Sequence, residues 1–159
     1  MKMEEKVAHL LIKLKKTLAI AESCSGGLLT NRLTNISGSS QFLKVGIIAY
    51  SNEAKSKLLK VPPSLINKYG AVSPETARAM AQGVRMSLQT DFGVSITGIA
   101  GPTGGTKTKP IGLTYIAVSS PKKVECLKWH FNGNRLQIKE SATTKALELL
   151  LKFITSQQH

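Results

Sequence analysis

Segments with the periodicity of amphipathic helices alternate with short apolar runs along the chain, and this alternation limits the fold more than any other feature. The apolar runs are rich in β-branched residues and only about 4–8 residues long, which is typical of buried strands. Helices that alternate with strands predict a layered α/β fold around one sheet. We expect this sheet to be largely parallel, with about five strands and a less regular edge in the C-terminal half.

The hydrophobic pattern and the turn signals also place the individual elements. We expect strands at residues 17–21, 42–50, 91–97, 113–119 and 124–131. We expect helices at residues 3–16, 26–33, 52–60 and 73–88, and a closing helix marked by apolar residues between 142 and 153. Ser73 and Pro74 suit the N-cap and first position of one helix, and Pro62 with Pro63 closes the preceding one.

Size and composition describe one globular domain. The chain has 159 residues, of which 42% are apolar and 19% charged. No apolar run approaches the roughly 20 residues of a membrane span, and charges interrupt the N-terminal segment too often for a signal peptide. We therefore expect a single domain over residues 1–159, located in the cytoplasm and without membrane association.

The charge of the chain favours an anionic partner. There are 22 Lys and Arg residues against 9 Asp and Glu residues, a net charge of +13. A phosphate ester, an acidic surface and nucleic acid all fit such an excess. The two cysteines and three scattered histidines show no spacing that suggests a metal site.

Reactive residues follow the expected strands, at residues 22–27, 50–55 and 97–105. Ligands collect at the carboxyl ends of strands in sheets of this kind. In the first segment, Ser23, Cys24 and Ser25 stand between a strand and a helix, and the free N–H groups of a helix start suit a nucleophile and an oxyanion hole.

That segment also allows two alternatives. A serine could simply cap the helix while Gly26 and Gly27 permit the tight turn. Cys24 could be the nucleophile, because the positive end of a helix lowers the pKa of a thiol, although a lone cysteine is more often a small core residue.

A serine nucleophile needs a base, and the chain supplies few histidines and only one aspartate for a Ser-His-Asp triad. Lysine is the remaining candidate, provided that burial or nearby positive charge lowers its pKa. Lys55 is the best placed, although a lysine in a short helix is commonly an exposed, solvated charge. The glycine-rich loop at 98–105 could approach a phosphate through its N–H groups, but it matches no established phosphate-binding pattern, and a plain loop fits equally.

Four sequence blocks resemble the signature blocks of the C-terminal domain of the CinA family, also called the nicotinamide-nucleotide amidase family, and they occur in the same order. They are AESCSGG at 21–27, GIIAYSNEAKSKLL at 46–59, YGAVSPETARAMAQG at 69–83 and VSITGIAGPTGGTKTKPIG at 94–112. The resemblance runs from about residue 5 to residue 155 and ends with FNGNR at 131–135 and the helix that follows. It implies a three-layer α/β/α sandwich on a mixed sheet and a stand-alone form of the domain.

The resemblance also implies an activity, the hydrolysis of the carboxamide of nicotinamide mononucleotide to nicotinic acid mononucleotide and ammonia. It implies Ser23 as the nucleophile, Lys55 as its base and Tyr50 as a residue that orients or tunes them. Thr97 and Arg135 would line the substrate pocket. No metal and no organic cofactor are implied.

The chain departs from the family pattern in three places. Ser25 stands where SCTGG has threonine, Asn134 precedes Arg135 where the family has GDR, and Lys139 replaces a later arginine. Lysine lacks the bidentate fork of arginine, so the last two changes affect how a phosphate is held. Many relatives carry a further N-terminal domain with nucleotide pyrophosphatase activity, for which this chain has no room.

For a partner we expect a small nucleotide substrate, which the N–H groups of Ser25, Gly26 and Gly27 help to bind, and we expect a homo-oligomer. The competing hypothesis is a competence-related or nucleic-acid-binding protein without this activity, motivated by the charge of +13. Aromatic residues are only 5% of the chain and the basic residues are spread along it, so no stacking platform with a focused basic stripe is evident. An inactive relative kept for assembly is a third hypothesis.

Overall fold

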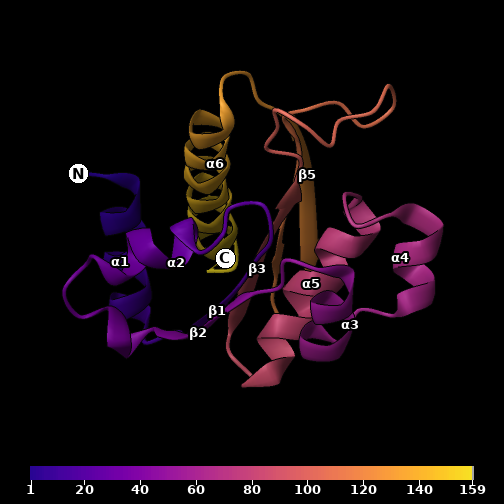
Figure 1. The fold of residues 1–159 in the computed structure, drawn as a ribbon. Helices are drawn as coiled ribbons and strands as arrows, with labels where there is room; N and C mark the ends of the chain where they lie inside the picture. The colour runs from indigo at the N-terminus through magenta and orange to yellow at the C-terminus, as the bar shows by residue number, and fades with distance from the viewer. Residues whose placement is uncertain (159) are drawn as a thin grey trace.

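The computed structural model describes residues 1–158, in which six α-helices, one short 3₁₀-helix and five strands follow one another. Their bounds are α1 Met3–Leu14, β1 Leu18–Glu22, α2 Leu28–Thr34, η1 Ser39–Gln41, β2 Leu43–Ile48, α3 Asn52–Leu59, α4 Pro63–Tyr69, α5 Pro74–Ser87, β3 Phe92–Gly98, β4 Leu113–Ser119, β5 Val124–His130 and α6 Arg135–Ser156. Figure 1 shows their arrangement in space.

The five strands form one mixed sheet in the order β2-β1-β3-β4-β5. The pairs β1–β2 and β1–β3 are parallel, whereas β3–β4 and β4–β5 are antiparallel. Four strands therefore point the same way and β4 alone is reversed, which confirms the mixed, mostly parallel sheet. The carboxyl ends of β1, β2 and β3 consequently meet at one edge.

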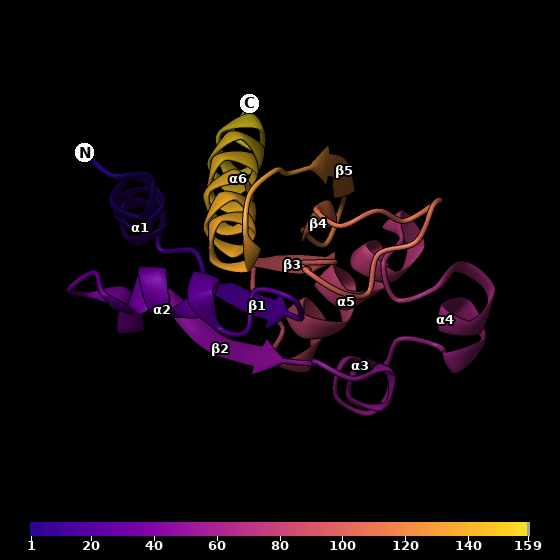
Figure 2. The ribbon, with the colours of Figure 1, turned by 45° about the horizontal axis from the view of Figure 1, so that its top comes forward.

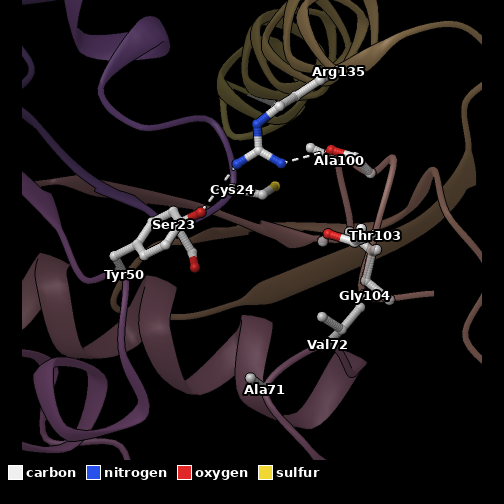
Figure 3. Close-up of a pocket in the computed structure, with 12 residues that line it drawn as sticks. Ser23, Cys24, Tyr50, Ala71, Val72, Ala100, Thr103, Gly104 and Arg135 are labelled. Carbon is white, nitrogen blue, oxygen red and sulfur yellow. Dashed lines mark hydrogen bonds between the residues drawn. The ribbon is translucent and has the colours of Figure 1, made fainter. Parts of the chain in front are cut away.

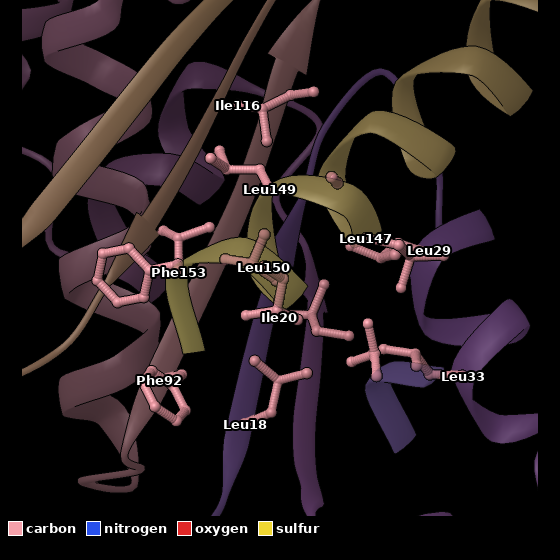
Figure 4. Packing of buried hydrophobic residues seen from close by; sticks show 14 of the residues in the cluster. Leu18, Ile20, Leu29, Leu33, Phe92, Ile116, Leu147, Leu149, Leu150 and Phe153 are labelled. Carbon is pink, nitrogen blue, oxygen red and sulfur yellow. The ribbon is translucent and has the colours of Figure 1, made fainter. Parts of the chain in front are cut away.

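Helices cover both faces of the sheet, which confirms the three-layer sandwich (Figures 1 and 2). Alternate side chains of β1 divide between the two faces: Leu18 and Ile20 pack with α1, α2 and α6, and Ala19 and Ala21 pack with α3, α4 and α5. Figure 4 shows the first of these cores, in which Leu29, Leu147 and Phe153 are fully or almost fully buried.

Two helices differ from the expectation. Pro62 and Pro63 do not only close α3; Pro63 begins the additional helix α4, because proline is tolerated in a first helical turn where no N–H is needed. Helix α6 begins at Arg135, before the apolar stripe that marked it, because Asn134 and Gln137 form a capping box. Ser73 caps α5 as expected, accepting a hydrogen bond from the N–H of Thr76 at 3.2 Å.

Within residues 1–158, no helix is both long enough and apolar enough to span a membrane.

Candidate active site

A cavity of about 390 Å³ opens at the edge where β1, β2 and β3 end (Figure 3). The three segments expected at strand ends do meet here, and they are joined by the loop before α5 and by the start of α6. The lining residues are Ser23, Cys24, Tyr50, Ala71, Val72, Gly98, Ile99, Ala100, Gly101, Thr103, Gly104 and Arg135. The volume falls within the roughly 300–1,000 Å³ of small-molecule sites.

Ser23 is held firmly at the end of β1. Its N–H donates to the carbonyl of Ile96 on β3 at 3.1 Å, and its carbonyl accepts from the N–H of Gly26 at 3.1 Å. Gly26 and Gly27 have φ values of 60° and 100°, so the tight turn after the serine uses the left-handed region that glycine tolerates. The Ser23 residue is 7% exposed and its hydroxyl borders the cavity.

Lys55 is not an exposed charge; it is buried against Ser23. The residue is 1% exposed, and its Nζ lies 3.0 Å from Ser23 Oγ. Nζ also donates to the carbonyl of Ala49 at 2.9 Å and to that of Tyr50 at 3.3 Å. Lys55 is carried by helix α3. Ser51 caps the start of this helix by accepting a hydrogen bond from the N–H of Ala54 at 3.0 Å.

The surroundings of Lys55 favour its neutral form. Burial lowers the pKa of this amine from the ordinary 10.5, with the Cys24 thiol acting weakly in the opposite direction. None of the salt bridges formed by residues 1–158 includes Lys55. A neutral amine has two N–H donors for the carbonyls of Ala49 and Tyr50 and a lone pair for the hydroxyl of Ser23, so the site can accommodate a general base.

This pKa predicts a pH-dependent contribution to stability. Because the amine binds its proton less tightly in the folded chain than in the unfolded chain, folding releases a proton between the lowered pKa and 10.5, and stability rises with pH in that window. The unfolding free energy of the wild type, relative to Lys55→Met, should therefore rise with pH, with a limiting slope of about 1.4 kcal/mol per pH unit. Urea unfolding at a series of pH values measures the difference.

Lys57→Met is the matched control, because Lys57 lies on the same helix with its side chain 73% exposed and pairs with Glu53. Its unfolding free energy should keep a nearly constant difference from the wild type over the same pH range. A constant difference for Lys55→Met as well would show that the pKa of Lys55 is the same in the folded and unfolded chains.

Cys24 is poorly suited to the nucleophile's role. Burial raises the pKa of its thiol to about 11, contrary to the expectation that the helix start would lower it. The loss of solvent on burial is the main cause, and the carboxylate of Glu22, which occupies the start of α2, raises this pKa to a smaller extent. The thiol is therefore protonated near neutral pH.

The same carboxylate changes which N–H groups are free. Gly27 donates to Glu22 Oε1 at 3.2 Å and Gly26 donates to the Ser23 carbonyl, so neither glycine offers its N–H to a ligand. The N–H groups of Cys24 and Ser25 have no hydrogen-bond partner within residues 1–158. Of these two residues only Cys24 lines the cavity, so the available oxyanion donor is the N–H of the residue directly after the serine and lies outside the expected range of residues 25–27.

Ser25 itself lies beneath the turn rather than in the cavity wall. The residue is fully buried, and its Oγ has no hydrogen-bond partner in the described part of the chain. Neither its side chain nor its backbone is therefore exposed to the cavity.

Tyr50 and Arg135 form a bridge at the mouth of the cavity (Figure 3). Arg135 Nη2 donates to the Tyr50 hydroxyl at 3.1 Å, and Nη1 donates to the Gly101 carbonyl at 2.7 Å. Tyr50 is 62% exposed. Its side chain therefore orients Arg135, while its backbone carbonyl contacts Lys55.

Thr97 supports the cavity without lining it. The residue is 1% exposed, and its hydroxyl donates to the Ala71 carbonyl at 2.9 Å. Ala71 and Val72, which do line the cavity, were not among the expected site residues. Their position just before the Ser73 N-cap was the available signal, since α5 begins at the same edge of the sheet.

In the described chain, no group of three or more His, Cys, Asp and Glu side chains is close enough to hold a metal ion.

Comparison with known proteins identifies the family. The model of the CinA C-terminal domain matches residues 1–154. A CinA-like protein of Syntrophus aciditrophicus is 50% identical over 155 residues, which are 97% of this chain and 37% of that protein. The chain thus spans well under half of that curated relative.

Solved structures agree over nearly the whole chain. A CinA superfamily protein from Klebsiella pneumoniae 700603 has a TM-score of 0.93 at 28% identity, covering 97% of this chain and 96% of its own. The competence/damage inducible protein CihA from Agrobacterium tumefaciens has a TM-score of 0.89 at 36% identity, covering 94% of each chain. The protein therefore belongs to the CinA C-terminal domain family.

Proposed function

We propose that the protein hydrolyses the carboxamide of nicotinamide mononucleotide, giving nicotinic acid mononucleotide and ammonia. The observation that carries the proposal is the buried amine of Lys55, without a carboxylate partner, 3.0 Å from the hydroxyl of Ser23 at the cavity. A serine and a lysine in this arrangement are the parts that a Ser–Lys hydrolase needs. The resemblance to the nicotinamide-nucleotide amidases supplies the choice of substrate.

In the acylation step, the neutral amine of Lys55 accepts the proton of Ser23 while Oγ attacks the amide carbon. The carbonyl oxygen becomes an oxyanion, which the free N–H of Cys24, a residue that lines the cavity, can stabilise. Collapse of this intermediate breaks the C–N bond, and the leaving nitrogen takes the proton from Lys55 and departs as ammonia. Ser23 is left as an ester and Lys55 is neutral again.

Deacylation repeats the sequence with water. Lys55 accepts a proton from the water molecule, the resulting hydroxide attacks the ester carbon, and Ser23 leaves with the proton returned by Lys55. The carboxylate product is released and the two residues return to their starting states. No other reactant is consumed.

Basic groups near the cavity suit the phosphate of the substrate. Arg135 lies at the mouth of the cavity, and Lys139 Nζ lies 3.3 Å from the position that a Cβ on Gly26 would occupy. No acidic side chain is among the residues that line the cavity. An anionic ligand therefore meets attraction without an opposing carboxylate.

The phosphate should be required for efficient turnover. Nicotinamide riboside and free nicotinamide should have kcat/KM values about 100-fold or more below that of the mononucleotide, because a charge-assisted contact contributes roughly 1.5–3 kcal/mol and two basic groups are available. Coupled ammonia-release assays measure all three substrates. Equal kcat/KM for riboside and mononucleotide would remove the phosphate site from the proposed function.

A further inference from the structure

The side chain of Glu22 is completely buried and directly precedes Ser23, yet it faces neither the cavity nor Lys55. Its carboxylate accepts four hydrogen bonds from the beginning of α2. Oε1 accepts from the N–H groups of Gly27 at 3.2 Å and Leu29 at 3.0 Å, and Oε2 accepts from the N–H of Thr30 at 2.9 Å and its hydroxyl at 2.7 Å. One carboxylate thus satisfies three backbone donors that a helix start leaves free.

Helix α2 has no other cap. Its N-cap residue is Gly27, which has no side chain to accept a hydrogen bond. The segment between Glu22 and Gly27 is therefore held at both ends. Strand β1 fixes its start, and the hydrogen bond from Gly27 to the Glu22 carboxylate fixes its end. This segment contains Ser23 and the two free N–H groups of Cys24 and Ser25.

The backbone of Glu22 contacts the other half of the site. Its carbonyl accepts from the N–H of Ala49 at 2.8 Å, and the carbonyl of Ala49 in turn accepts from Lys55 Nζ at 2.9 Å. A substitution of the side chain leaves these backbone contacts in place. The side chain can therefore be tested separately from the support of Lys55.

We propose that the Glu22 side chain is a positioning residue for the amidase reaction, which clamps the turn from Ser23 to Gly27 onto α2 and so fixes Ser23 and the N–H of Cys24 that serves as the oxyanion donor. The inference rests on the proposed function, since it takes Ser23 as the nucleophile. The carboxylate accepts from the Gly27 N–H, while the N–H of Cys24, which lines the cavity, stays without a partner. The negative charge of the Glu22 carboxylate also stabilises the positive end of α2, and this carboxylate forms no ion pair with Lys55.

Glu22→Gln tests this proposal with a nearly isosteric change. A glutamine must turn its NH₂ group towards two of the four donors, which loosens the turn. We expect kcat per active site to fall about 10-fold to 100-fold with KM unchanged, because a displaced oxyanion donor affects the transition state and not substrate binding. The pH at which kcat/KM rises should stay the same, since Lys55 keeps its partners.

Counting active sites separates positioning from folding. Phosphorylation of Ser23 by diisopropyl fluorophosphate, in which Oγ displaces fluoride, gives the concentration of competent sites. Its rate should fall in parallel with kcat, because this reaction also develops charge on an oxygen. Glu125→Gln, the same change on β5, should match the wild type in every measurement. An unchanged kcat per active site in Glu22→Gln would overturn the proposal.

A second pair of variants applies if Glu22→Gln does not fold. Thr30→Val removes one donor to the carboxylate and should lower kcat, whereas Thr30→Ser keeps the hydroxyl and should retain it; equal kcat values for the two would overturn the proposal. If the wild type releases no ammonia, the proposed function fails, and the phosphorylation rates of the same variants with diisopropyl fluorophosphate still decide whether Glu22 positions the turn.

Discussion

Ser23→Ala should lower ammonia release from nicotinamide mononucleotide by about 10,000-fold or more, the size of effect seen when the nucleophile of a serine hydrolase is removed. The hydroxyl is the only group that the substitution removes, and the backbone hydrogen bonds of residue 23 to Ile96 and Gly26 remain. The fold should therefore be unchanged. Steady-state ammonia assays and thermal unfolding of the same preparation measure the two effects.

Cys24→Ala is the matched control for the neighbouring position. Because burial raises the pKa of this thiol to about 11, it is protonated at working pH, and its loss should leave kcat within about twofold of the wild type. Loss of activity in Cys24→Ala together with a fully active Ser23→Ala would transfer the nucleophile's role to the thiol.

Lys55→Arg should lose about 1,000-fold or more of kcat/KM, and Lys55→Ala should lose as much, because a guanidinium keeps its proton at every accessible pH and cannot act as a base. The same substitutions at the exposed Lys57 should have little effect. Activity in Lys55→Arg would show that position 55 supplies only positive charge, and Tyr50 would be the next candidate for the base.

The pH profile of the wild type follows from the same group. Burial lowers the pKa of Lys55, and the neutral amine is the active form, so kcat/KM should rise with pH through that pKa and level off above it. The substrate phosphate titrates near pH 6, so the profile is read above about pH 7. A profile that falls with pH in that range would contradict the assignment of Lys55 as a base.

The order of the elements followed from the sequence because periodicity and caps are local properties. All five strands, the N-cap at Ser73 and the meeting of three strand ends at one edge were predicted in this way. Helix α4 was missed because Pro62 and Pro63 serve equally as a stop and as a start. Only the packing of Ile66 against α3 and α5 distinguishes these two roles.

The chemistry of the site depended on contacts that no local pattern contains. In NEAKSKLLK, Lys55 and Lys57 look alike, yet one is buried against Ser23 and the other is exposed and paired with Glu53. Their difference arises from which face of α3 turns inward, towards Ser23 and the core shared with α4 and α5. Glu22 was likewise overlooked, since a carboxylate at the end of an apolar strand shows its role only when α2 folds back onto it.

The most direct test of the account is the covalent intermediate. Wild-type protein mixed with nicotinamide mononucleotide, quenched in acid within the first turnover and digested, should contain the pyridine acyl group of the substrate as an ester on Ser23, together with one equivalent of released ammonia. Mass spectrometry of the peptide that spans residues 17–32 identifies the modified residue. An acyl group on Cys24, or a full turnover of ammonia from protein whose Ser23 is never modified, would contradict the account.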